Sequence, residues 1–206
     1  MKKLVLFLVP ALLMMVQACE VTAPDAAGPK VDFPVDLTQA ETDGGIMSPE
    51  ILWKFGRVGG MALSPDGQTV LYTVSYYDVP TEQRESQIYA IPTEGGEPVQ
   101  LTTEGGYSPS WKAGNETIGF LRGRQLWEMN ADGSGQKQIS EVETGIESYA
   151  YSADGSMIWF STRVKMDQTP NEKHGMDKAN MRIIDDLMFR HWDYWHDYAY
   201  SHVFTA

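Results

Sequence analysis

Four consecutive side chains near the end of the chain, Arg190, His191, Trp192 and Asp193, are of the types that bind a peptide. An arginine can donate charge-assisted hydrogen bonds to a carbonyl or a carboxylate, and a carboxylate can accept them from a free amino group. The apolar residues around them recur three and four positions apart, which predicts a short amphipathic helix or turn that runs into an aromatic patch: Ile183, Ile184, Leu187, Met188, Trp192 and Trp195. Two interpretations stay open: this stripe packs onto the underlying scaffold, or the four residues help to hold a peptide.

The sequence contains no motif that is typical of a catalytic site or of a metal site. The histidines His191 and His196, interleaved with Asp193 and Asp197, are five positions apart, which fits no standard ligand spacing. Neither a metal nor a cofactor is expected. The nucleophile elbow Gly-x-Ser-x-Gly does not occur, since the nearest stretch, residues 106–110, lacks the second glycine. No catalytic residue is assigned.

The N-terminus has the layout of an export signal. Two lysines precede an apolar run of 13 residues, 4–16, which is too short to cross a bilayer of about 30 Å comfortably. The run leads into Val-Gln-Ala-Cys, which resembles the lipobox of bacterial lipoproteins. Residues 1–18 are therefore predicted to be a lipoprotein-type signal peptide and Cys19 the lipidated first residue of an exported, envelope-bound protein. Plain secretion after cleavage near Ala18 is the alternative.

Residues 19–47 are predicted to form an acidic, flexible tether. Between Glu20 and Glu50 seven carboxylates stand against one lysine, and such a composition cannot bury enough apolar surface to offset the entropy of ordering. The whole chain carries a net charge of −12, and loss of the two signal-peptide lysines leaves 14 basic and 28 acidic residues, a net −14. This charge argues against nucleic-acid binding, which needs clustered lysines and arginines.

The elements that must position the candidate residues repeat along the chain. Polar turns at 64–67, 112–115 and 152–155 each precede a strand with apolar residues two positions apart. Units of four short strands, roughly 40 to 45 residues long, are typical of β-propeller blades. Asp-Gly supplies the positive φ of a tight hairpin in the first and third turns, and Asn115 is expected to replace the glycine in the middle one.

The fold class is therefore all-β, a partial β-propeller over residues 48–206 with two complete four-stranded blades and part of a third. Residues 201–206 align with the third strands of the earlier units, so the chain is expected to be truncated inside a blade; a small open β-meander is the alternative. Two long middle connections, 75–86 and the insertion at 163–200, are expected on one face, and long insertions usually carry function.

The segment Ser48-Pro49-Glu50-Ile51-Leu52-Trp53-Lys54-Phe55, with the residues up to Gly67, resembles the start of the propeller domain of prolyl oligopeptidase family serine peptidases. The bacterial dipeptidyl-peptidase 5 and acylaminoacyl-peptidase types are the most similar, and the block from Arg182 to Phe204 is similar to an insertion in their propellers. The resemblance covers about residues 48–204. It implies a propeller that caps a C-terminal α/β-hydrolase domain with a Ser, Asp and His triad, and this domain is absent from the sequence.

Two function classes follow. The resemblance implies the propeller part of an exported serine exopeptidase, which limits access to short peptides and helps to bind them, with no catalytic activity expected from this chain alone. Its partners would be short peptides, its own hydrolase domain and, through the lipid, a membrane. The alternative is a non-catalytic propeller lipoprotein that binds a protein or a glycan.

Overall fold

The computed structural model of the protein describes residues 33–176, 178–179, 182–184, 187 and 189–206. The predicted signal peptide and Cys19 lie outside these residues. Two short helices, α1 (Gln39–Gly44) and α2 (Pro49–Lys54), precede the sheets, and α1 was not expected within the acidic tether. A capping box between Thr38 and Glu41 explains where α1 begins. Within the described ranges no helix has the length and hydropathy needed to cross a membrane.

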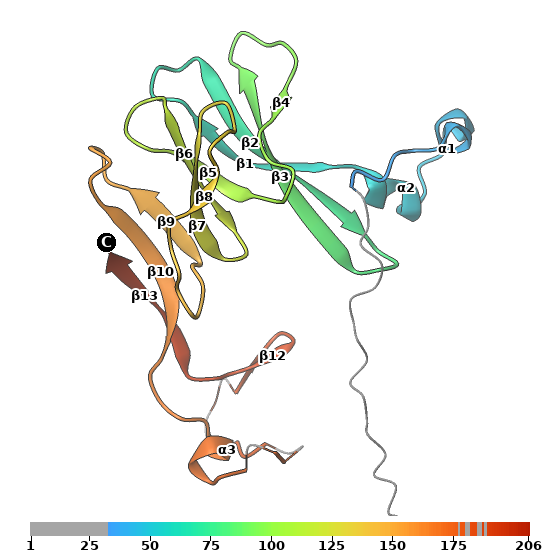
Figure 1. Cartoon of the computed structure of the whole chain (residues 1–206). Coiled ribbons are helices and arrows are strands. Elements are labelled where there is room, and N and C mark those ends of the chain that lie inside the picture. Colours follow the sequence, from blue (N-terminus) through green and yellow to red (C-terminus); the bar gives the residue numbers. More distant parts are fainter. Residues whose placement is uncertain (1–32, 177, 180–181, 185–186, 188) are drawn as a thin grey trace, which may run out of the picture. The chain divides into compact units, whose positions relative to one another are not determined.

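Three antiparallel sheets follow one another along the chain and lie side by side (Figure 1). The first pairs β1 (Arg57–Leu63), β2 (Thr69–Asp78), β3 (Gln83–Pro92) and β4 (Val99–Gln100) in chain order, and the second pairs β5 (Tyr107–Trp111), β6 (Thr117–Arg122), β7 (Gln125–Asn130) and β8 (Lys137–Gln138) in the same way. The third has the order β13-β10-β9, with β9 at Ser148–Tyr151, β10 at Ile158–Lys165 and β13 at Ala199–Thr205. The prediction of two four-stranded blades and part of a third is confirmed.

The middle connection of the first blade differs from its prediction. Strands β2 and β3 stay paired as far as Asp78 and Gln83, so residues 75–86 form the end of a long hairpin and not a loop. The run of tyrosine, threonine and valine in β2 favours a strand, and the facing hydroxyls of Ser75 and Ser86 lie 2.8 Å apart in a hydrogen bond. This hairpin and the third-blade insertion leave their sheets toward the same side, as expected (Figure 1).

The three polar turns share one hydrogen-bond scheme only in part. In the first, the Ser64 hydroxyl donates to Asp66 Oδ1 over 2.6 Å and accepts from the Thr69 amide over 2.9 Å, and the third turn repeats both bonds. The middle turn corrects the prediction for Asn115, because the positive φ of 89° falls on the preceding Gly114. Asn115 instead accepts a bond of 3.3 Å from the Asp66 amide and so links two blades.

The third turn makes a testable prediction about pH. The pKa of Asp154 is lowered to about 2, chiefly because the Ser152 hydroxyl donates to it and then because the Ser156 amide and hydroxyl do. A carboxyl with a lowered pKa stabilises the fold above its ordinary pKa of about 4, and this contribution is lost as the pH falls toward 2. We expect Ser152→Ala to raise the pKa of Asp154, measured by a carbon NMR titration. The control Ser148→Ala removes a hydroxyl that bonds to Ser161 and should change nothing at Asp154; a pKa that stays near 2 in Ser152→Ala would contradict the assignment.

Two hydrophobic cores join neighbouring blades. The first contains Leu71 and Ile88 of the first blade with Ile118 and Phe120 of the second, all fully buried. The second joins Leu121, Leu126 and Ile146 to partly buried apolar residues of the third blade. Buried apolar contacts between the faces of neighbouring blades hold the blades together. The alternating apolar residues of one blade therefore supply one side of a core, and those of the next blade supply the other side.

A glutamine in the third strand of each complete blade also has a structural role. In the first blade Gln87 Oε1 accepts a bond of 2.7 Å from the Thr102 hydroxyl, which itself accepts one of 2.9 Å from the Ile88 amide. In the second blade Gln125 and Ser140 repeat the same pair of bonds at 2.9 Å and 2.8 Å. A buried hydroxyl thus completes the ladder where the fourth strand turns away.

Candidate functional site

The insertion of the third blade stands on a two-stranded stem. Strands β10 and β13 are paired without a break from Trp159 opposite Thr205 to Lys165 opposite Ala199. Between them lie the helix α3 (Pro170–Lys173), which begins with a capping box, and a hairpin made of β11 (Arg190–His191) and β12 (Tyr194–Trp195). The stem therefore fixes both ends of the insertion to the blade.

In the described part of the apolar stripe, Trp192 and Trp195 belong to a hairpin, whereas Ile183, Ile184 and Leu187 are in neither a helix nor a strand. Trp192 has a φ of 53°, a left-handed conformation that places a tight turn between β11 and β12. Of the helix or turn predicted for this stripe, the described residues show a turn and no helix. The aromatic patch is present: the Phe189 and Trp195 rings stack at 6.2 Å between centroids, and Arg190 lies over the Trp195 ring at 5.2 Å. Met188 lies outside the described residues.

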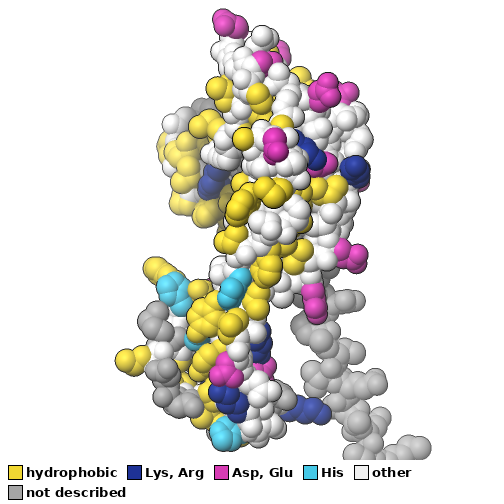
Figure 2. Space-filling model, turned by 90° about the vertical axis from the view of Figure 1, so that its left-hand side faces the viewer, with side chains coloured by type: hydrophobic (Ala, Val, Ile, Leu, Met, Phe, Trp, Pro, Cys, Tyr) yellow, Lys and Arg dark blue, Asp and Glu magenta, His cyan; other side chains and the backbone are white. Residues whose placement is uncertain are grey.

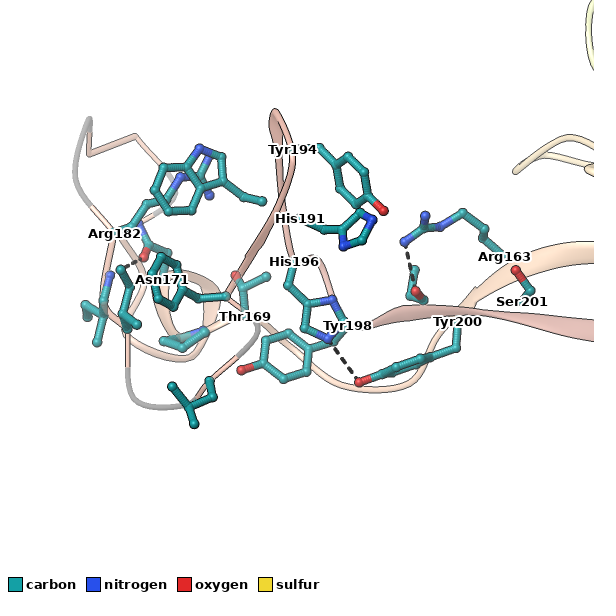
Figure 3. A pocket seen from close by; sticks show the side chains of 17 residues that line it. Arg163, Thr169, Asn171, Arg182, His191, Tyr194, His196, Tyr198, Tyr200 and Ser201 are labelled. Atoms are coloured by element: carbon teal, nitrogen blue, oxygen red, sulfur yellow. Dashed lines mark hydrogen bonds between the residues drawn. The ribbon is translucent and has the colours of Figure 1, made fainter.

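A pocket of about 540 Å³ opens inside the insertion (Figure 3). Its walls come from the end of β10, the start of β13, α3, the segment before β11 and the hairpin. It is lined by Arg163, Thr169, Pro170, Asn171, Arg182, Ile183, Ile184, Leu187, Phe189, His191, Tyr194, Trp195, His196, Tyr198, Ala199, Tyr200 and Ser201. All described residues of the predicted apolar stripe except Trp192 are thus part of the pocket lining.

The four predicted peptide-binding residues do not meet in one place. His191 lines the pocket, with its ring 5.4 Å from that of Tyr194. Trp192 and Asp193 form the tip of the hairpin, where the Trp192 side chain is 86 % exposed. Arg190 is exposed and lies over Trp195, beside the pocket rather than in its lining. Consecutive residues of a hairpin alternate in direction, which separates them.

Sequence reasoning missed Arg163 and Tyr200, and it considered His196 and Asp197 only as metal ligands. Arg163 Nη2 donates to Asp197 Oδ1 over 2.7 Å and to the Ala199 carbonyl over 2.8 Å. His196 Nε2 and the Tyr200 hydroxyl share a hydrogen bond of 3.0 Å (Figure 3). The sequence did hold a signal for Arg163. Residues 201–206 align with the third strands of the earlier blades, so they are expected to pair with the second strand of the third blade, and this pairing places Arg163 opposite Ser201.

Two ion pairs connect α3 to its surroundings, one to Lys165 of the stem and one to Asp167. The Lys165 ammonium lowers the pKa of Glu172 by donating a hydrogen bond to it, and Lys173 acts in the same way on Asp167. All four side chains are at least a third exposed, so each pair contributes little to stability. Among the described residues no three histidine, cysteine, aspartate or glutamate side chains come together as metal ligands.

The sequence is similar to that of two curated peptidases. No protein-family model matches the sequence. The chain is 32% identical over 176 residues to dipeptidyl-peptidase 5 of Porphyromonas endodontalis and 38% identical over 167 residues to dipeptidyl-peptidase 5 of Porphyromonas gingivalis. These matches cover 82% and 78% of this chain but 25% and 24% of the relatives. The chain therefore spans about a quarter of the length of the relatives that it matches.

Solved structures of low sequence identity share the fold. An acylaminoacyl peptidase in complex with Z-Gly-Gly-Phe-chloromethyl ketone aligns with a TM-score of 0.59 at 14% identity, over 76% of this chain and 24% of that one. The acylaminoacyl peptidase of Pyrococcus horikoshii aligns with a TM-score of 0.53 at 15% identity, over 68% of this chain and 21% of that one. The sequence relatives support the expected resemblance of the chain to an N-terminal portion of the prolyl oligopeptidase family, and the solved structures show that the chain shares their fold.

Proposed function

We propose that the chain is the N-terminal propeller part of an exported serine exopeptidase, a dipeptidyl- or acylaminoacyl-peptidase that acts on short peptides. The observation that carries this proposal is the 32% and 38% identity to two dipeptidyl-peptidases 5 over about four fifths of the chain. The 206 residues contain no nucleophile elbow, so the reaction would need an α/β-hydrolase domain encoded beyond Ala206. The same proposal places the protein at the cell envelope, held by a lipid on Cys19.

The propeller would control which molecules reach the catalytic domain. A pocket of about 540 Å³ falls within the range of sites that hold small ligands, and it lies in the longest connection of the described blades. The hairpin tip with Trp192 and Asp193 supplies an exposed aromatic ring and a carboxylate next to it. These groups suit contact with a short peptide, because its free amino group would donate a charge-assisted hydrogen bond to the carboxylate.

The full gene product, translated beyond Ala206, tests this function. It should react covalently with a fluorophosphonate probe and release dipeptides or blocked residues from short peptides, while a folded protein stays intact. The matched control is the 206-residue chain, which should not react with the probe. In cells, the labelled protein should fractionate with membranes and a Cys19→Ser variant should not. A full-length product that fails to react with the probe would overturn the peptidase proposal and favour a binding lipoprotein.

A further inference from the structure

The charges of the insertion pocket oppose those of the whole chain. Its described lining contains two arginines, Arg163 and Arg182, two histidines, His191 and His196, and no aspartate or glutamate. The chain as a whole holds 28 acidic and 16 basic residues, so a described lining without carboxylates stands out against it, although Asp197, just outside that lining, pairs with Arg163. Figure 2 shows histidine and hydrophobic side chains gathered on the same part of the surface. Such a wall attracts an anion rather than an amine.

Arg163 is held in place but keeps donors to offer. Nη2 uses both of its hydrogens, one on Asp197 Oδ1 and one on the Ala199 carbonyl. These two bonds fix the plane of the guanidinium, while Nη1 and Nε make no hydrogen bond to a described residue. A guanidinium that is already ordered loses little entropy when it binds a planar, two-oxygen group.

Two more polar groups face the same space. In Figure 3 the Arg163 guanidinium, the His191 ring and the Tyr194 hydroxyl point toward one another. Neither the His191 ring nor the Tyr194 hydroxyl has a hydrogen-bond partner within the described part of the chain. Three donors that converge without an acceptor between them suit a carboxylate, which can accept about four hydrogen bonds.

The opposite wall is apolar and aromatic. Ile183, Phe189 and Trp195 line it, and the Arg182 guanidinium lies 4.6 Å from the centre of the Trp195 ring. The arginine lies over the face of the indole, and the apolar side chains beside it leave a surface of the kind that holds a large aliphatic or aromatic side chain. The volume of about 540 Å³ leaves room for both the charged group and such a side chain.

We propose that this pocket binds the carboxylate end of a short apolar peptide. The carboxylate meets Arg163, His191 and Tyr194, and the neighbouring apolar side chain packs against Trp195. This inference names the ligand class of the insertion and rests on the proposed function for the peptide nature of that ligand. The carboxylate comes from the C-terminus of the peptide or from an acidic side chain, and both sources share this chemistry.

Equilibrium binding of three probes to the full gene product, treated beforehand with the fluorophosphonate so that no probe is cleaved, tests the proposal by calorimetry. The probes are the dipeptide Ala-Phe, its amide Ala-Phe-NH2, and Glu-Phe-NH2, whose only carboxylate is on a side chain. We expect at least one carboxylate probe to bind about tenfold or more tightly than Ala-Phe-NH2. Ala-Phe as the tighter probe identifies a C-terminal carboxylate, and Glu-Phe-NH2 identifies an acidic side chain. Equal binding of all three, or no binding, overturns the proposal.

Arg163→Met should abolish the preference for the carboxylate, because it removes the charge but keeps an apolar stem. The matched control is Lys165→Met, on the same strand, whose ammonium pairs with Glu172 and does not line the pocket; it should keep the preference. If Arg163→Met does not fold, as judged by its melting curve, Tyr194→Phe replaces it and should reduce the preference several-fold. A preference that survives in the folded variant overturns the proposal.

The readouts separate this inference from the peptidase function. A protein that reacts with the fluorophosphonate is blocked by it before binding is measured, so the probes stay intact whether or not the protein hydrolyses peptides. Probe labelling without binding that depends on Arg163 would refute the pocket assignment alone. Binding that depends on Arg163 in a protein that never reacts with a fluorophosphonate would refute the peptidase proposal alone.

Discussion

Replacing Phe120 by alanine should lower the free energy of unfolding by about 3 to 5 kcal/mol. The Phe120 side chain has no exposed surface and lies in β6, at the centre of the core that joins the first two blades. Its ring lies 6.4 Å from that of Trp127, with the Arg122 guanidinium over it at 5.2 Å. Strands of two sheets surround the ring, and such paired backbone cannot collapse into the cavity that alanine would leave.

Chemical denaturation of the full gene product, followed by tryptophan fluorescence, measures this loss. The matched control is Phe55→Ala, because Phe55 is 44 % exposed and lies at the end of α2. We expect the control to cost about 1 kcal/mol or less. Equal losses for the two variants would mean that the core between the first two blades does not hold the propeller together.

Replacing Gly119 by alanine should destabilise the contact between the second and third blades by about 1 to 3 kcal/mol. A Cβ at this position would lie only 2.7 Å from Cε2 of the Tyr151 ring, and still closer to its hydroxyl oxygen. That hydroxyl donates to Glu128 Oε1 over 3.1 Å, and the same oxygen receives the Lys112 ammonium at 2.9 Å. The ring cannot move aside without breaking this cluster.

A double-mutant cycle checks the cause. In a Tyr151→Ala background the Gly119→Ala substitution should cost much less, since the opposing ring is gone. The control Gly59→Ala lies in β1, has no atom within 4 Å of the added Cβ and has no positive φ, so it should leave stability nearly unchanged. A cost for Gly119→Ala that persists without the Tyr151 ring would contradict the steric explanation.

The blades could be predicted from the sequence because their signals are local. Polar turns and apolar residues two positions apart depend on the conformation of a few neighbouring residues, and the structure reproduces both around Val70, Ile118 and Ile158. The exact residue with positive φ was not predictable in the middle turn. Asn115 tolerates that conformation, but its side chain bonds to another blade and Gly114 takes the turn.

The pocket could not be predicted in the same way, because its parts are distant in sequence. Arg163 and His191 belong to different elements, and only the pairing of β10 with β13 and the hairpin turn at Trp192 bring them to one space. The period of three and four residues suggested a helix because bulky residues in a short hairpin and its flanks can fall at that spacing by chance. The spacing does not show the left-handed conformation of Trp192, which sets the hairpin turn.

The stem of the insertion has a consequence for how such a protein can change over evolution. Lys165 and Ala199 already face each other across an antiparallel ladder, so a tight two-residue turn could join them without altering the register of the blade. Everything between them can be exchanged, lengthened or lost while the strands beneath stay paired. The paired strands of the blade therefore carry the insertion without depending on its sequence. Selection for a new ligand can change the inserted segment while the strand pairing of the blade stays the same.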